Sequence, residues 1–264
     1  GMSADGVALA SILTQYLSSI LILIALVRTK DAYGVRPKCI RLHRDKLAPL
    51  LTLCCSAGLQ NAIFAVANLF IQAGVNRFDA LMVEGNSAAA NADGLIYDVM
   101  AAFHTACASF IGQNYGAGNR DRVRRTYWIS LSYSFAAGAV LGLSLVFFGR
   151  GFLALFTDSA EVAAAGMHRL RVMGFSYAIS AFMDCTIAAS RGLGRCVVPT
   201  IIVVLGSCVF RVIWVYTIFA SVGTIASLYL LYPVSWTLTA GAEMVYFFYL
   251  YRKVFRNPAK PATV

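Results

Sequence analysis

The sequence is poor in charged residues and in the side chains that build metal centres. Only 13% of its 264 residues are charged, whereas 59% are apolar, and this balance excludes an ordinary soluble domain with a polar shell. The three histidines are scattered along the chain, and no pair of cysteines has zinc or redox spacing. A metal site or a membrane-embedded metalloenzyme is therefore not indicated.

Lysine is scarce as well. Its five copies, at positions 30, 38, 46, 253 and 260, all lie outside the long apolar runs. A light-driven retinal pump needs a lysine within a span, so these positions argue against that class. The stretch "GQNYGAG" lacks the Lys-Ser/Thr pair that completes a phosphate-binding loop, which excludes nucleotide binding there.

Long apolar runs dominate what is present. Each run has about 20 residues or more, which is enough to cross a bilayer at about 1.5 Å per residue. The seven runs cover roughly residues 6–27, 50–74, 85–112, 127–149, 167–190, 197–220 and 225–250. The sequence therefore predicts an all-α fold, a polytopic membrane helical bundle of about seven transmembrane helices with the lipid bilayer around it.

The basic residues alternate with these runs in a way that predicts membrane orientation. The formal charge is +10, but one predicted face receives almost all of it. That face carries Arg28, Lys30, Arg36, Lys38, Arg41, Arg44, Lys46, Arg120, Arg122, Arg124, Arg125, Arg191, Arg195, Arg252, Lys253, Arg256 and Lys260. The other receives only Arg77 and Arg150, with Arg169 and Arg171 near a helix entrance. By the positive-inside rule we expect a multi-pass protein of the cell (inner) membrane with a cytoplasmic C-terminus, and no nucleic-acid partner.

The polar stretch between the first two runs predicts the domain boundary. It contains Gly34, Pro37 and seven basic residues. We expect a separate helix over 1–27, a basic loop over 28–46, a unit of six helices over 47–256 and a tail over 257–264. The later turns are short, so consecutive helices should be antiparallel neighbours, and Pro233 should kink the last one.

Polar residues inside the runs recur at helical spacing, and in hydrocarbon such faces should turn inward. The third run has Ser87, Asn91, Gly94, Asp98, Ala102, Thr105 and Ser109 on one face. Shorter stripes occur in the other runs: Asn61, Asn68 and Gln72; Ser176, Ser180 and Asp184; Thr200, Ser207, Arg211 and Trp214; Tyr232, Trp236, Thr239, Glu243 and Tyr246.

The charges within these stripes do not balance. Asp98, Asp184 and Glu243 face a single base, Arg211. Counting residues from the predicted cytoplasmic ends puts Asp98 and Arg211 at similar depth, so we expect these two to pair, with Asp184 and Glu243 in a lower layer. The unpaired acids must be protonated, bind a cation or face water, which is the chemistry of a cation-coupled transporter. The same side chains would also suit static contacts between helices.

Four further motifs occur in the chain: "SFIGQNYGAGNRDRVRR", "GVALASILTQ", "SRGLGRCVVPT" and "FRVIW". Together they resemble motifs of the multidrug and toxic compound extrusion (MATE) transporters. The resemblance implies twelve helices in two lobes, of which this chain supplies the last helix of the first lobe and the whole second lobe. The amino-terminal lobe would then be a missing partner. It also implies drug efflux driven by inward flow of protons or sodium ions, with no other cofactor.

The coupling residues of the family do not carry over directly. Some members have a glutamate in the first helix of this lobe and an aspartate in the fourth, where this chain has Asn68 and Ser180. Asp184 lies one turn away from the second of these positions. A family-type sodium site is therefore not expected in this lobe, and coupling is expected to rest on the absent lobe or on the acids within the spans.

These observations lead to one functional prediction and two alternatives. We expect a non-enzymatic, proton- or sodium-coupled antiporter that exports small amphipathic organic cations such as drugs or toxic compounds, present here as a carboxy-terminal fragment. The alternatives are a lipid-linked sugar flippase of related fold and a seven-helix receptor or pump. The expected ion or substrate residues, with Arg211 as charge partner, are Asp98, Asp184, Glu243, Asn68, Ser180, Trp236 and Tyr246; Trp and Tyr rings near a carboxylate suit an organic cation.

Overall fold

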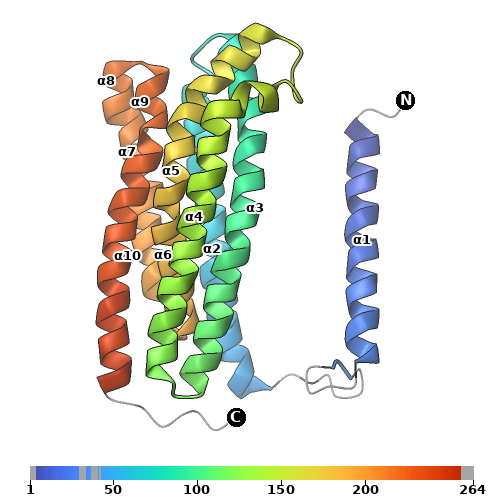
Figure 1. Cartoon of the computed structure of the whole chain (residues 1–264), viewed down its shortest axis with the longest axis vertical. Helices are drawn as coiled ribbons and strands as arrows, with labels where there is room; N and C mark the ends of the chain where they lie inside the picture. Colours follow the sequence, from blue (N-terminus) through green and yellow to red (C-terminus); the bar gives the residue numbers. More distant parts are fainter. Residues whose placement is uncertain (1–3, 30–33, 37–40, 42, 257–264) are drawn as a thin grey trace. The chain divides into compact units, whose positions relative to one another are not determined.

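The computed structural model describes residues 4–29, 34–36, 41 and 43–256, and all regular secondary structure in these ranges is helical (Figure 1). The chain divides into two units, residues 1–50 and 51–264. Each unit is described by itself. The predicted tail over 257–264, together with Lys30, Pro37 and Lys38 of the predicted basic loop, lies outside the described residues.

The first unit is dominated by helix α1, Ala4–Arg28. No residue in the most apolar window of its segment Leu9–Arg28 is buried. The following helix, α2, covers Arg44–Val75. It therefore includes the last three residues of the loop expected over 28–46, because a polar helix end can extend beyond the apolar run that marks the bilayer.

Helices α2 to α5 each contain one predicted apolar run and extend beyond it. Helix α3 covers Ala80–Gly116, α4 covers Arg120–Leu153 and α5 covers Ala160–Gly192. The side chains of Asp79 and Ser159 cap the starts of α3 and α5 by accepting hydrogen bonds from the amides of Met82 and Val162. Gly118 reverses the chain after α3 with φ 72°, a left-handed conformation that glycine adopts without strain.

The sixth predicted run is one continuous helical rod with two π-helical stretches. Its parts are α6 (Val197–Val203), η2 (Val204–Val209), α7 (Phe210–Trp214), η3 (Val215–Phe219) and α8 (Ala220–Val222). A π-turn widens the helix by one residue and redirects the side chains that follow. The short segment α7, which carries Arg211, lies between the two widened stretches.

The seventh run is broken near its start. Helix α9 covers Ile225–Tyr229, and α10 covers Leu231–Arg256 after a turn at Leu230. Pro233 lies in the first turn of α10, where its ring has no N–H to donate to Tyr229. The kink expected at Pro233 is thus observed as a break three residues earlier.

The helices are of a length and composition that suit a membrane. Six stretches can cross one by these criteria: Leu9–Arg28, Leu50–Val75, Ala80–Gly116, Arg120–Leu153, Ala160–Gly192 and Val197–Val222. The rod formed by α9 and α10 is less apolar. With it, the fold has about seven long helical rods, as the sequence predicts.

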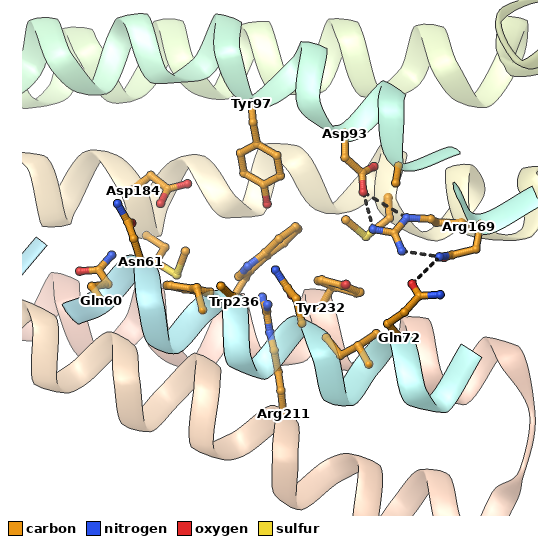
Figure 2. Close-up of a pocket in the computed structure, with 18 residues that line it drawn as sticks. Gln60, Asn61, Gln72, Asp93, Tyr97, Arg169, Asp184, Arg211, Tyr232 and Trp236 are labelled. Atoms are coloured by element: carbon orange, nitrogen blue, oxygen red, sulfur yellow. Dashed lines mark hydrogen bonds and ion pairs between the residues drawn. The ribbon is translucent and has the colours of Figure 1, made fainter. Parts of the chain in front are cut away.

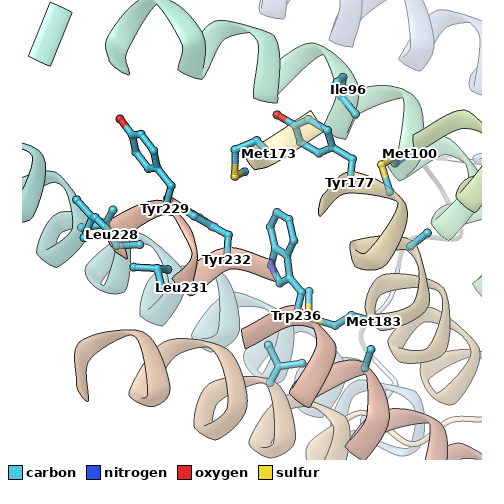
Figure 3. Close-up of a cluster of buried hydrophobic side chains, with 14 of the residues drawn as sticks. Ile96, Met100, Met173, Tyr177, Met183, Leu228, Tyr229, Leu231, Tyr232 and Trp236 are labelled. Atoms are coloured by element: carbon cyan, nitrogen blue, oxygen red, sulfur yellow. The ribbon is translucent and has the colours of Figure 1, made fainter. Parts of the chain in front are cut away.

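Helix α5 is the centre of the second unit, hereafter the six-helix unit (residues 51–256). It contacts α3, α4, α6, α9 and α10, and 67% of its most apolar window is buried. Glycine permits its close crossing with α4, since a Cβ at Gly142 would lie 2.0 Å from the carbonyl oxygen of Gly174. Large apolar and aromatic side chains from α3, α5, α9 and α10, among them Trp236 and Tyr177, fill the space around it (Figure 3).

Candidate functional site

A cavity of about 650 Å³ lies inside the six-helix unit, bounded by α2, α3, α5, α7 and α10 (Figure 2). Its size is typical of sites for small organic ligands. The polar residues of its wall are Gln60, Asn61, Asn68, Gln72, Asn86, Asp93, Arg169, Asp184 and Arg211. Aromatic and apolar side chains, including Phe64, Tyr97, Tyr232 and Trp236, form the rest.

One end of the cavity is lined by a hydrogen-bonded network around Arg169. Its guanidinium pairs with the Asp93 carboxylate, with an Nε to Oδ2 distance of 3.1 Å, and donates to the Asn86 amide oxygen at 2.8 Å. Tyr177 also donates its hydroxyl to Asp93, and Tyr229 donates to Asn86 at 3.0 Å. Both charged groups of this network, Arg169 and Asp93, are paired with each other. The network therefore has a structural role, in which it joins α3, α5 and α9.

Arg211 has a different environment on the adjoining wall. Its side chain is only 3% exposed, and its one hydrogen bond among the described residues runs from Nε to the Ser235 hydroxyl at 3.3 Å. Its guanidinium carbon lies 4.7 Å from the ring centre of Tyr232, 5.5 Å from Phe64 and 5.8 Å from Trp236. Aromatic faces attract a cation, but no carboxylate of the described chain pairs with this one.

Asp184 extends from α5 toward the same space. Its side chain is half-buried and lines the cavity beside Asn61 and Tyr97 (Figure 2). Within the described chain, Asp184 forms neither a hydrogen bond nor an ion pair. The cavity therefore holds one acid and one base, Asp184 and Arg211, that lack a bonded partner of opposite charge.

Glu243 does not line the cavity and is fully buried on α10. Its side chain is 0% exposed, and neither carboxylate oxygen has a hydrogen-bond partner among the described residues. Arg191, whose charge acts on Glu243, instead donates to the Gln60 amide oxygen at 2.7 Å. An unpaired charge is costly at such a site, so the neutral acid is the form that fits.

The structure brings some of the predicted site residues together and separates others. Asp184, Asn68, Trp236 and Arg211 line the one cavity. The remaining four do not line it. Ser180 donates within α5 to the Tyr177 carbonyl oxygen at 2.9 Å, and Tyr246 packs into the apolar cluster around Phe247. Glu243 is buried at a different place, and Asp98 is exposed on α3.

The predicted ion pair between Asp98 and Arg211 is wrong. Asp98 is exposed, whereas Arg211 is buried among aromatic rings. The whole predicted polar face of α3, from Ser87 to Ser109, is exposed on the six-helix unit. A different face, with Asn86, Ala89, Asp93 and Met100, turns inward. Five residues along a helix rotate a side chain by about 140°, so Asp93 and Asp98 cannot both point into the cavity.

Sequence reasoning missed the network around Arg169. From the sequence, Arg169 is expected near a helix entrance and is not counted among the charged residues within the apolar runs. No role is assigned to Asp93. A usable signal exists in the sequence. Asn86 and Asp93 are seven residues apart, two helical turns, and share a face with Gly85, Ala89 and Ala92. Small residues mark the face that packs closely on another helix, so polar residues among them are the ones to expect inside.

Comparison with known proteins gives a consistent assignment. The family model MatE matches residues 57–217. A MOP superfamily transporter from Pyrococcus furiosus, described as having a binding pocket of reverse polarity, is 18% identical and superposes with a TM-score of 0.84 over 96% of this chain and 57% of that one. The outward-facing form of a multidrug resistance MATE family transporter is 19% identical, with a TM-score of 0.84 and the same coverage. Because both identities are below 20%, the structural similarity supports the assignment of the fold alone.

A relative of known sequence, a FAD transporter from Shewanella oneidensis, is 28% identical over 123 residues, which are 47% of this chain and 26% of that protein. The chain thus spans little more than half the length of the solved structures. Its match to the FAD transporter covers about a quarter of that protein.

Proposed function

The chain belongs to the MatE family of membrane transporters, and from this premise we propose that it is the carboxy-terminal portion of a secondary antiporter. The antiporter exports small amphipathic organic cations against an inward flow of protons or sodium ions. It lies in the inner cell membrane with its C-terminus in the cytoplasm, an orientation supported by the basic residues at one set of helix ends. Alternating access requires a second lobe to rock against this one.

The observation that carries the proposal is the environment of Asp184. This carboxylate lies on the central helix α5, reaches the cavity and has no bonded partner in the described chain. An acid within a membrane span that faces a cavity can take up a proton or a sodium ion and release it when the cavity opens to the other side. We assign the coupling step to Asp184.

The exposed face of α3 supports the choice of a cationic substrate. Glu84 and Asp98 are both exposed on this helix, and no lysine or arginine occurs between Ala80 and Gly116. A carboxylate facing lipid is costly, so we place this face on a watery passage between the two lobes. Its acidic character attracts cations entering that passage.

Gradient-driven efflux of a cationic dye tests the proposal. The complete natural polypeptide is reconstituted in vesicles loaded with ethidium, and a proton or a sodium gradient is imposed. We expect at least one gradient to accelerate efflux, Asp184→Asn to abolish that acceleration, and Asp158→Asn, which changes an exposed acid, to preserve it. Efflux indifferent to both gradients would refute secondary antiport, and a fully coupled Asp184→Asn variant would remove Asp184 from the mechanism.

A further inference from the structure

The positive charges of the two arginines that line the cavity, Arg169 and Arg211, are balanced to very different extents. Arg169 has a carboxylate, an amide oxygen and two tyrosine rings around it. Arg211 has one hydroxyl partner, Ser235, and aromatic faces. Guanidinium stays charged at all physiological pH values, so the charge of Arg211 cannot be removed by losing a proton. It needs an anion.

No group of the described chain supplies that anion. The single ion pair found there joins Arg169 to Asp93. Asp184 lines the same cavity from α5 but lies beyond ion-pair distance of Arg211. The aromatic rings recover only part of the free-energy cost of removing the guanidinium from water. A guanidinium also offers several N–H donors in one plane, and Nε alone is used here.

The cavity in front of Arg211 has the shape and chemistry of a ligand site. Its volume is about 650 Å³. Tyr97 and Phe64, both half-buried, present aromatic rings to it, and Asn61 and Asn68 present side-chain amides. The buried Trp236 completes the wall and contacts Tyr97, with 6.2 Å between the ring centres. Planar rings stack favourably on such walls, and the fork of a guanidinium binds a carboxylate or phosphate through two parallel hydrogen bonds.

We propose that this cavity binds a small aromatic anion, a planar ring that carries a carboxylate or phosphate group. Arg211 pairs with the anionic group, and the ring lies against Tyr97 and Phe64. Asp184 repels the ligand while it is ionised and sets the limit on affinity. The inference goes beyond the proposed transport function, because binding at Arg211 requires neither an ion gradient nor movement of the lobes. The exported cation is assigned to the acidic passage beside α3 and not to this cavity.

Three ligands that differ only in charge test the proposal. The probes are 2-naphthoate, neutral 2-naphthalenemethanol and the 2-naphthylmethylammonium ion, measured by equilibrium dialysis against the complete natural polypeptide in lipid nanodiscs. Empty nanodiscs correct for partition into lipid. We expect naphthoate to bind at least tenfold more tightly than either other probe. Equal binding of all three, or preference for the ammonium ion, would overturn the proposal.

Substitutions locate the site. Arg211→Gln should weaken naphthoate binding at least tenfold, while Arg150→Gln, which removes an exposed positive charge from α4, should leave it unchanged. Asp184→Asn should strengthen naphthoate binding severalfold. A folded Arg211→Gln variant with wild-type naphthoate affinity would contradict the proposal. If that variant does not fold, Asp184→Asn decides: unchanged or weaker naphthoate binding would contradict it equally.

Discussion

The acids of the six-helix unit differ in how their charge is compensated. Asp93 accepts hydrogen bonds from Arg169 and Tyr177. Among the residues that the structure describes, Asp184 faces the cavity without a bonded partner, and Glu243 is fully buried without one. The sequence reveals which acids lie within apolar runs, because composition alone locates the runs. It does not reveal which acid is paired, because pairing depends on helix rotation, as Asp93 and Asp98 demonstrate.

Two acids of α3 should therefore respond differently to the same substitution. Asp93→Ala leaves the buried Arg169 without its carboxylate, and we expect a loss of about 3–5 kcal/mol in the free energy of unfolding. Asp98→Ala removes an exposed side chain and should change it by less than about 0.5 kcal/mol. Thermal unfolding in detergent measures both. Equal destabilisation by the two variants would contradict the assignment of Asp93 as the structural acid.

Glu243 provides a second test at the scale of one residue. Its carboxyl oxygens are buried and have no hydrogen-bond partner within the described part of the chain. Glu243→Met, which keeps the length and removes the polar atoms, should therefore stabilise the fold by about 1–3 kcal/mol. Thr239→Val on the same helix removes a hydroxyl that is bonded to Ser207 and Ser235 and should destabilise it by a similar amount. Melting temperatures compare the two, and a destabilised Glu243→Met variant would mean that Glu243 has a partner outside the described chain.

Whole helices were predicted more accurately than their irregularities. The apolar runs gave the order and approximate extent of the rods, since about 20 apolar residues suffice to mark a span. The runs did not reveal the π-helical stretches η2 and η3 that flank Arg211, because a widened turn has no distinctive composition. Close packing of α4 on α5 depends on single glycines: Gly138 and Gly142 both lie against α5.

The crossing of α4 and α5 should tolerate no side chain at Gly142. A Cβ there would lie 2.0 Å from the carbonyl oxygen of Gly174, so Gly142→Val must push the helices apart. We expect a loss of about 1–3 kcal/mol or failure to fold. Gly241→Ala on α10 meets nothing within 4 Å and should be neutral or stabilising by up to about 1 kcal/mol. Expression yield and melting temperature distinguish them; a native-like Gly142→Val protein would rule out this packing.

The chain covers 57% of the two solved transporter structures compared with it. The six-helix unit exposes a polar, acidic face on α3 that lipid cannot solvate at low cost. The motif resemblance predicted the family and the lobe. It could not assign a substrate or a coupling ion, because both depend on side chains at individual positions, and at two of the family's coupling positions this chain has Asn68 and Ser180.

Water accessibility of the α3 face tests this view of the whole molecule. In a variant without native cysteines, Asp98→Cys should react readily with a water-soluble maleimide, because we place it on the passage between lobes. Val245→Cys, at a position 73% exposed on α10, should react at least tenfold more slowly because it faces lipid. The labelling is measured by mass shift in intact membranes. Slow reaction at both positions would put the α3 face against lipid or in a dry interface.

The most direct test of the account is whether substrate binding displaces an ion from Asp184. Purified complete protein in weakly buffered solution is titrated with ethidium, while a pH indicator and a sodium electrode record any released ion. We predict release of protons or sodium ions from the wild-type protein and from Asp158→Asn, and none from Asp184→Asn. Undiminished release from Asp184→Asn would contradict the claim that this unpaired carboxylate couples transport to the ion gradient.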